Sequence, residues 1–133
     1  MLERTLAIIK PDGVKNRVIG EIIRRYEQDG LNPIAIRSVR LTKEQAEQFY
    51  QVHRERPFFG DLTSFMSSGP IVVLALEGEG AILRHRDLMG ATDPAMAAEG
   101  TIRKAFGTSI DSNVVHGSDA SDAASEEIKF FFN

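Results

Sequence analysis

The stretch "SGPIVVLAL", residues 68–76, holds the clearest strand signal in this sequence. Ser68, Gly69 and Pro70 form a turn signal, and an apolar run with β-branched side chains follows it. A short apolar run that begins at a turn signal is typical of a buried strand. The neighbouring elements follow outward from this strand.

Toward the N-terminus, the sequence predicts two more strands with a helix between them. "TLAIIK" (5–10) is a β-rich apolar run that Pro11-Asp12-Gly13 ends. "VIGEIIRRYEQDG" (18–30) repeats apolar residues at helical spacing and stops at Gly30. In "PIAIRSVRL" (33–41) the alternation slips by one residue after Ile36, which predicts a β-bulge at that point.

Helices are predicted on both sides of residues 71–76. Thr42 and Gln45 form a capping-box pattern that opens a helix through Tyr50, and a second helical segment follows Pro57. Another helix is expected over roughly residues 79–88.

The segment 90–112 mixes Gly, Thr, Pro, Ser and Asp with little periodicity. A long irregular connection inside a compact domain is usually functional or disordered. "NVVH" (113–116) then predicts a short strand, and "SDAASEEIKFFF" (121–132) predicts a final helix. The resulting βαββαβ order with extra helices favours an antiparallel sheet with helices on one face. A doubly wound parallel sheet is the competing topology.

Composition narrows the class of protein. With 133 residues, 42% hydrophobic and 26% charged, the chain is expected to form one globular domain over residues 1–133. A net charge of -3 gives no general attraction to nucleic acid or an anionic membrane, so a phosphate site must be a local group of cations. The lack of cysteine excludes disulfides and thiol chemistry. Since no signal peptide or membrane helix is evident, we expect a cytoplasmic protein.

Several familiar motifs are present only in part. "HRDL" (85–88) copies the start of a protein-kinase catalytic loop, but Thr92 replaces its asparagine and neither VAIK nor DFG occurs. "GEGAIL" (78–83) lacks the last glycine of a dinucleotide fingerprint, and there is no GxxxxGK[ST] phosphate loop. The histidines at 53, 85 and 116 are too far apart in sequence for a local metal site, so no metal ligands are predicted.

"NVVHGSD" (113–119) places His116 at a strand end, directly before Gly117. Glycine permits close backbone approach, and we expect Ser118 and Asp119 to begin a helix whose N-terminus favours an anion. A phosphate brought to this imidazole would meet favourable partial charges. His116 is therefore either a reactive imidazole presented on a turn or a structural histidine.

Glu127 is the candidate partner of His116. Its spacing puts it on one face of the final helix with Ala124, Ile128 and Phe131, so it faces the core or its edge. A buried carboxylate needs a partner. Bonded to one imidazole nitrogen, it would fix the tautomer and leave the other nitrogen free to attack. The equal alternative is that Glu127 pairs with a lysine or arginine, or extends its carboxylate to solvent.

Three cations and one aromatic residue could complete a phosphate site. Lys10 ends the first strand, while Arg86 and Arg103 flank and enter the irregular segment, and both residue types bind phosphate. Phe58, on an amphipathic segment, could stack on a nucleobase. Taken singly, such cations are more often solvated, and such a phenylalanine more often packs in a core.

Four segments, in order, resemble the nucleoside diphosphate kinase family. They are "ERTLAIIKPDGV" (3–14), "ERPFFGDLTSFMSSGPIVV" (55–73), "MGATDPAMAAEGTIRKAF" (89–106) and "NVVHGSD" (113–119). The resemblance covers essentially the whole chain. It implies an α+β, ferredoxin-like βαββαβ fold, a four-stranded antiparallel sheet with additional helices. It also implies ping-pong transfer of the γ-phosphate of a nucleoside triphosphate to a nucleoside diphosphate, with little base or sugar specificity.

The resemblance assigns catalytic roles to individual residues. His116 matches the nucleophile that becomes phosphohistidine, and Glu127 matches the acid that orients it. Ser118 matches a hydroxyl that supports the same carboxylate. Lys10 and Tyr50 match residues around the γ-phosphate and nucleophile.

The resemblance also assigns a nucleotide site and partners. The residues that match nucleotide-binding positions are Lys10, Phe58, Arg86, Thr92, Arg103 and Asn113. Mg²⁺ would be carried by the nucleotide phosphates with little direct ligation by the protein. The implied partners are nucleoside tri- and diphosphates, such as ATP/ADP, GTP/GDP and their deoxy forms, and further copies of the chain in a homo-oligomer.

Two departures and two rival functions stay open at this point. Ala105 stands where the family usually has an acid, and the chain ends at Asn133, earlier than most members, which bears on subunit contacts. A catalytically silent nucleotide-binding module of the same fold is one rival function. A single-strand nucleic-acid binder is the other, and the acidic net charge and scarce strand aromatics weigh against it.

Overall fold

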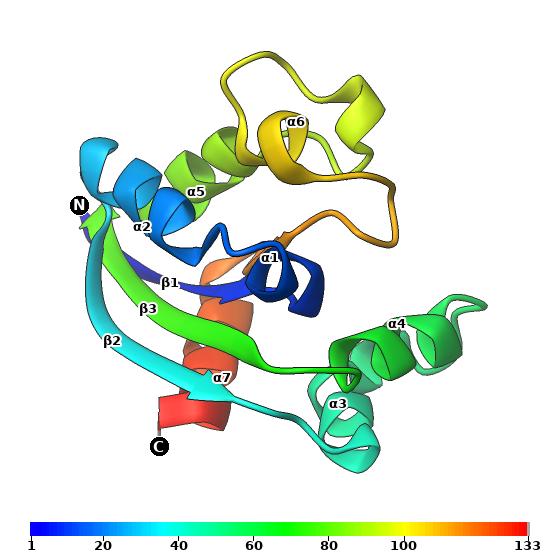
Figure 1. The fold of residues 1–133 in the computed structure, drawn as a ribbon. Helices are drawn as coiled ribbons and strands as arrows, with labels where there is room; N and C mark the ends of the chain where they lie inside the picture. Colours follow the sequence, from blue (N-terminus) through cyan, green and yellow to red (C-terminus); the bar gives the residue numbers. More distant parts are fainter. Residues whose placement is uncertain (133) are drawn as a thin grey trace.

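The computed structural model describes residues 1–132. Strands β1 (Leu2–Ile9), β2 (Asn32–Val39), β3 (Ile71–Glu79) and β4 (Val115–Gly117) form one sheet in the order β2-β3-β1-β4 (Figure 1). Each neighbouring pair is antiparallel. The expected four-stranded, ferredoxin-like βαββαβ arrangement is confirmed, and the doubly wound parallel alternative is wrong.

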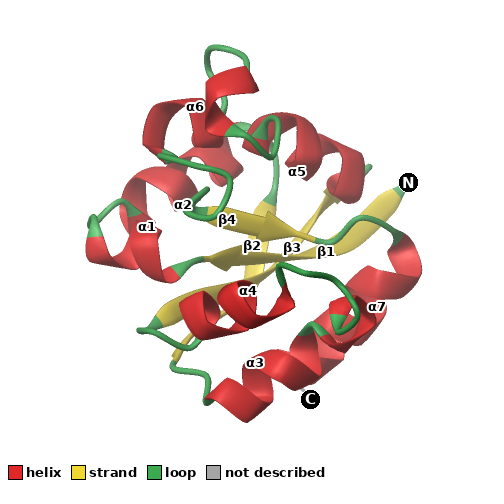
Figure 2. Ribbon diagram, turned by 90° about the vertical axis from the view of Figure 1, so that its right-hand side faces the viewer, coloured by secondary structure: helices red, strands yellow, loops and turns green. Residues whose placement is uncertain are grey.

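Helices flank the sheet on both sides, as Figure 2 shows with the strands in the middle. They are α1 (Pro11–Lys15), α2 (Ile19–Gln28), α3 (Lys43–Phe49), α4 (Phe59–Met66), α5 (Ala81–Met89), α6 (Ile102–Phe106) and α7 (Ser121–Phe132), with two 3₁₀ turns, η1 (Gln51–His53) and η2 (Pro94–Met96). Among the helices of residues 1–132, none combines the length and apolar character needed to traverse a bilayer.

The alternation of side chains along β1 explains the two helical layers. Leu6 and Ile8 belong to the core cluster that α3, α4 and α7 cover, whereas Ala7 and Ile9 belong to the cluster that α2 and α5 cover. All four side chains are fully buried, and burying a large aliphatic side chain contributes about 1.5–3 kcal/mol. The expectation of helices on one face alone is therefore wrong, because a sheet that is apolar on both faces needs cover on both.

Local signals were correct for some elements and misleading for others. Thr42 and Gln45 form the predicted capping box at the start of α3. The bulge in β2 lies between Pro33 and Ala35, and its predicted position after Ile36 is wrong. The short helix α1 was not expected, since Pro11-Asp12-Gly13 is a turn signal; here proline and aspartate occupy the first helical turn, where both are favoured.

Candidate active site

Pairing with β1 determines where the side chains of β4 point. Ile8 lies opposite His116, and Ala7 lies opposite Gly117. Residues directly opposite one another share a face of the sheet. His116 therefore faces the layer of α3 and α7 with Ile8, and Gly117 faces the layer of α2 and α5 with Ala7.

His116 is held from α7 by the predicted carboxylate. Its Nε2 lies 2.9 Å from Oε1 of Glu127, and Ser118 donates its hydroxyl to the same oxygen at 2.8 Å. Ser118 in turn accepts the backbone N–H of Leu6 at 3.2 Å. Within the described chain Glu127 pairs with this imidazole and not with a lysine or arginine. The His116 side chain keeps 19% of its exposure, so the ring is reachable from solvent.

This pairing assigns the protons of the imidazole. A carboxylate can only accept, so Nε2 of His116 carries a proton and donates it to Glu127. In the neutral form of the imidazole, the lone pair then resides on Nδ1. No hydrogen bond within residues 1–132 occupies Nδ1. The neutral form of this ring is therefore an oriented nitrogen nucleophile.

A cavity of about 350 Å³ opens in front of this ring, within the size range of small-molecule sites. Five of the predicted site residues line it: Lys10, Tyr50, Phe58, His116 and Glu127. Ser118 lies behind them, almost fully buried. Lys10 follows β1, Tyr50 follows α3 and Phe58 precedes α4. His116 lies on β4 and Glu127 on α7.

Lys10 is an unusual lysine, because it is 7% exposed. Its Nζ donates to Oδ1 of Asn113 at 2.8 Å. Burial lowers the pKa of Lys10 to about 8, with the charge of Arg103 adding to the effect, while the charges of Asp12 and Asp111 oppose it. The cation is therefore poorly solvated and short of a full counter-charge, which favours an incoming anion.

Arg103 does not project freely into the cavity. It is 8% exposed, and its guanidinium donates to the backbone carbonyls of Gly90 at 3.0 Å, Asn113 at 3.3 Å and Val115 at 2.8 Å. Burial lowers its pKa, and the nearby charge of Arg86 acts in the same direction. Arg103 thus joins both ends of the segment 90–112 to β4.

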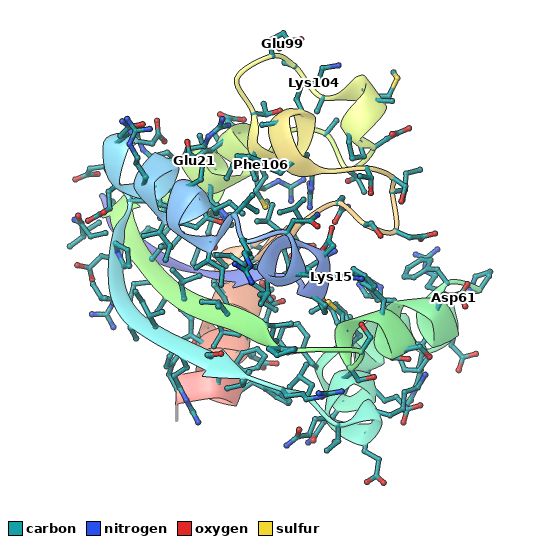
Figure 3. All side chains as sticks on the ribbon, in the orientation of Figure 1. Lys15, Glu21, Asp61, Glu99, Lys104 and Phe106 are labelled. Carbon is teal, nitrogen blue, oxygen red and sulfur yellow. The ribbon has the colours of Figure 1, made fainter. Side chains whose placement is uncertain are left out.

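The remaining predicted phosphate ligands lie on the α5 side. Arg86 and Thr92 are exposed and are not among the residues that line the cavity. Asn113 is buried, and its amide donates to the backbone carbonyl of Thr92 at 3.1 Å. This contact connects the loop to the residue that holds Lys10. Glu99 lies on the outer turn of the loop, at the top of the molecule in Figure 3, and Lys104 lies on α6.

Tyr50 is buried beside the nucleophile. Its ring meets that of His116 edge-on, with centroids 6.1 Å apart. Burial raises its pKa, and the charge of Glu127 adds to this. Its hydroxyl has no hydrogen-bond partner among residues 1–132, and a buried hydroxyl without a partner is costly. A polar ligand group in the cavity would remove that cost.

Phe58 stands at the mouth of the cavity. It is 45% exposed, which is high for a phenylalanine, and its ring lies 5.6 Å from the ring of His53. Core packing is therefore not the role of this side chain, and its face is available to a flat ligand.

Two aromatic contacts of the site were missed from the sequence. The ring of Phe49 lies 5.5 Å from that of His116, edge-on, and lines the same cavity. On the opposite face His85 is fully buried beneath Gly117, with Nε2 3.0 Å from the hydroxyl of Tyr26. Burial lowers the pKa of His85 to about 3. The spacing of Ala81, His85 and Met89 on α5 is the signal that would have identified this histidine as a core residue.

One expectation about the strand end is wrong. The last helix begins at Ser121, not at Ser118 and Asp119. Ser118 instead continues the contact between β4 and β1, because its backbone N–H donates to the carbonyl of Leu6. Gly117 does have the close approach that was expected: a Cβ there would lie 2.5 Å from Nδ1 of His85.

Comparisons with known proteins identify the family of this chain. The family model described as "Nucleoside diphosphate kinase" matches residues 3–133. A nucleoside diphosphate kinase of Desulfosudis oleivorans is 63% identical over 132 residues, covering 99% of this chain and 95% of its own length. One of Myxococcus xanthus is 62% identical over 131 residues, covering 98% and 90%.

Solved structures give the same result. The nucleoside diphosphate kinase of Aquifex aeolicus matches with a TM-score of 0.99 and 46% identity, covering 100% of this chain and 96% of the other. A halophilic nucleoside diphosphate kinase of Halobacterium salinarum, in complex with CDP, matches with a TM-score of 0.95 and 42% identity, covering 100% and 89%.

Proposed function

This chain belongs to the nucleoside diphosphate kinase family and transfers a phosphoryl group from a nucleoside triphosphate to a nucleoside diphosphate, and we propose that His116 carries that group between the two substrates. The observation that supports this role is the pairing of Nε2 with Glu127 in a residue that lines the cavity, because in the neutral ring this pairing leaves the lone pair on Nδ1. The intact pair also disfavours a catalytically silent module.

The transfer occurs in two steps of the same kind. The lone pair on Nδ1 of His116 attacks the γ-phosphorus, the bond to the β–γ bridging oxygen breaks, and the diphosphate leaves with that electron pair. A terminal phosphate oxygen of the second diphosphate then attacks the phosphorus on His116, and the nitrogen regains its lone pair. Because the phosphoryl group stays on His116 while the first diphosphate leaves and the second binds, the kinetics are ping-pong. Glu127 keeps its hydrogen bond to Nε2 and stabilises the positive charge that the ring gains.

Phosphoryl transfer depends mainly on positioning and on charge stabilisation. We assign the charge to Lys10, Arg86 and Arg103, and a phosphate contact to the unpartnered hydroxyl of Tyr50. Of these three cations, Lys10 is the one that lines the cavity together with His116. Arg103 already bonds three carbonyls, so its contribution to phosphate binding uses the N–H groups that those bonds leave free.

Mg²⁺ is proposed to arrive with the nucleotide. Within residues 1–132, no group of three or more His, Cys, Asp or Glu side chains could hold a metal ion. Mg²⁺ is commonly bound through one or two carboxylates together with substrate phosphates. The exposed carboxylate of Asp119 lines the cavity, so the residues present fit an ion bound mainly by the nucleotide. When bound, the ion neutralises phosphate charge.

We propose little discrimination among bases or sugars. Phe58 offers an exposed aromatic face, and stacking on such a face tolerates every base. Association of several copies of the chain is also proposed. Strand β2 is an edge of the sheet and exposes Ile34 and Ile36, and an apolar edge strand is suited to pairing with another chain.

Labelling with γ-³²P ATP tests the role of His116. The wild-type protein is expected to gain acid-labile, alkali-stable label and to release ADP in a burst, whereas His116→Ala gains none and keeps its fold. His53→Ala is the matched control and gains label, because His53 has no carboxylate partner in the described chain. Glu127→Ala is expected to be labelled more slowly. Label that persists on His116→Ala would remove this residue from the proposed role.

A further inference from the structure

The backbone two residues before the nucleophile is strained. Val114 has φ 77°, and the only other non-glycine residue of the described chain with positive φ is Arg17. A β-branched residue rarely adopts this conformation. The N–H of Val115 donates to the carbonyl of Asn113 at 2.9 Å, which makes a γ-turn of the strained kind centred on Val114. Such a conformation persists only where the surroundings hold it.

Contacts from three directions hold this turn. The carbonyl of Val114 accepts the backbone N–H of Lys10 at 2.7 Å. Arg103 bonds the carbonyls of the residues on either side, Asn113 and Val115. The N–H of Val114 donates to Oδ2 of Asp12 at 3.1 Å. Of these contacts, the one from Asp12 joins a side chain directly to the strained residue, Val114.

Helix α1 is built to deliver this carboxylate. Asp12 lies in its first turn, directly after Pro11, and the next residue, Gly13, packs on the side chain of Val114. A Cβ at Gly13 would lie 3.1 Å from Cγ1 of Val114 and 2.8 Å from Cγ2 of Ile9. The helix therefore sits against the turn with no room to spare, and Asp12 has little freedom to point elsewhere.

The second oxygen of Asp12 shows what this placement costs. Oδ1 is buried and has no hydrogen-bond partner among residues 1–132. A buried carboxylate oxygen without a partner is unfavourable for folding. Burial of this side chain therefore adds little to the stability of the fold. Outside α1, the hydrogen bond that its carboxylate accepts comes from Val114, in the turn that precedes His116.

We propose that Asp12 is a positioning residue for the nucleophile. By accepting the N–H of Val114, it holds the γ-turn that sets the path of the chain into β4, and so fixes the direction in which Nδ1 of His116 points. Asp12 is not among the residues that line the cavity at His116. The inference rests on the proposed role of His116 and adds a residue that acts on it through the backbone.

The test separates the rate of phosphorylation from nucleotide binding. Asp12→Ala removes the acceptor, whereas Asp12→Asn keeps an oxygen that can accept the same N–H but removes the charge. Rapid mixing with γ-³²P ATP measures the rate at which label appears on the protein, and calorimetry measures the affinity for ADP. Misplacement by about 1 Å can slow a reaction up to about 100-fold. We expect Asp12→Ala to be labelled at least about tenfold more slowly, with ADP affinity within about threefold of wild type.

The conservative variant distinguishes positioning from charge. Asp12→Asn is expected to be labelled within about threefold of the wild-type rate. Asp111→Ala is the matched charge control: it removes an exposed acid that, like Asp12, acts on Lys10 but does not contact Val114. Exchange of the Val114 amide with solvent, followed by NMR, should accelerate in Asp12→Ala and not in the other two variants.

Several results would overturn the proposal. They are a wild-type labelling rate in Asp12→Ala, an Asp12→Asn variant as slow as Asp12→Ala, and a loss of ADP affinity equal to the loss of rate. If Asp12→Ala does not fold, the test depends on Asp12→Asn. A folded Asp12→Asn variant that is labelled tenfold more slowly than wild type would then reject the proposal. Label that persists on His116→Ala is a different result, because it rejects the role of His116 itself.

Discussion

Replacing Lys10 by methionine should make the free protein more stable while it abolishes transfer. Lys10 is 7% exposed, and its pKa falls from 10.5 to about 8. That difference corresponds to about 3 kcal/mol of unfavourable free energy for the charged form at pH 7. Methionine fills a similar volume without the charge.

One contact opposes this gain. Asn113 is buried, and its Oδ1 would lose the hydrogen bond from Nζ, which costs about 1–2 kcal/mol. The net expectation for Lys10→Met at pH 7 is a free energy of unfolding about 1–2 kcal/mol higher than wild type.

The lowered pKa of Lys10 also determines how the stability of the two proteins depends on pH. The pKa of Lys10 is lower in the folded state, so between pH 8 and pH 10.5 the unfolded state binds more protons and the stability of the wild type rises with pH. Below pH 8 the full cost of the buried charge is present. The stability of Lys10→Met relative to wild type should therefore be highest near pH 7 and fall by about 2–3 kcal/mol at pH 10, where the variant becomes the less stable protein.

Urea denaturation of both proteins at pH 7 and pH 10 measures these differences. Lys15→Met is the control, because Lys15 is exposed at the end of α1, the helix that begins directly after Lys10 (Figure 3). It should change the free energy of unfolding by less than about 0.5 kcal/mol. A Lys10→Met variant that is less stable than wild type at pH 7, or a difference independent of pH, would refute the reasoning.

Two further predictions concern the back of the site and the open sheet edge. Gly117→Ala would place a Cβ 2.5 Å from the buried ring of His85 and should lower the free energy of unfolding, measured with urea, by about 1–3 kcal/mol. In the control Gly20→Ala a Cβ meets nothing within 4 Å, so stability should stay the same or rise. Equal effects of the two changes would reject the steric explanation for Gly117. Light scattering should find the wild type assembled and Ile36→Lys, on the exposed edge strand β2, in smaller species; a monomeric wild type would contradict the proposed association.

The succession of strands along the chain and the inward position of Glu127 could be predicted because each depends on short-range pattern, whereas the pairing of Glu127 with His116 was assigned by the family resemblance. The apolar run at 71–76 and the spacing of Glu127 with Ala124 and Phe131 are visible in the sequence, and the structure has them as expected. The bulge in β2 was misplaced because β2 is a half-exposed edge strand, where alternation reports register weakly.

Long-range partners were beyond the reach of pattern. An arginine in a loop gives no sign that its guanidinium will face backbone carbonyls, as Arg103 does. An aspartate after a proline reads as a turn residue, and nothing local connects Asp12 with Val114, 102 positions away in the chain. Such contacts follow from the pairing of β1 with β4, which only the complete fold provides.

The three carbonyl contacts of Arg103 also determine how this region opens. Surface loops commonly detach from a domain on their own, at low free energy. Here the side chain of Arg103 donates hydrogen bonds to the carbonyl of Gly90, at the beginning of the loop, and to that of Val115, in β4. The loop and β4 should therefore unfold together as one cooperative unit. Insertions acquired during evolution would be tolerated in the outer turn near Glu99 (Figure 3), but not at either end of the loop, where Arg103 binds.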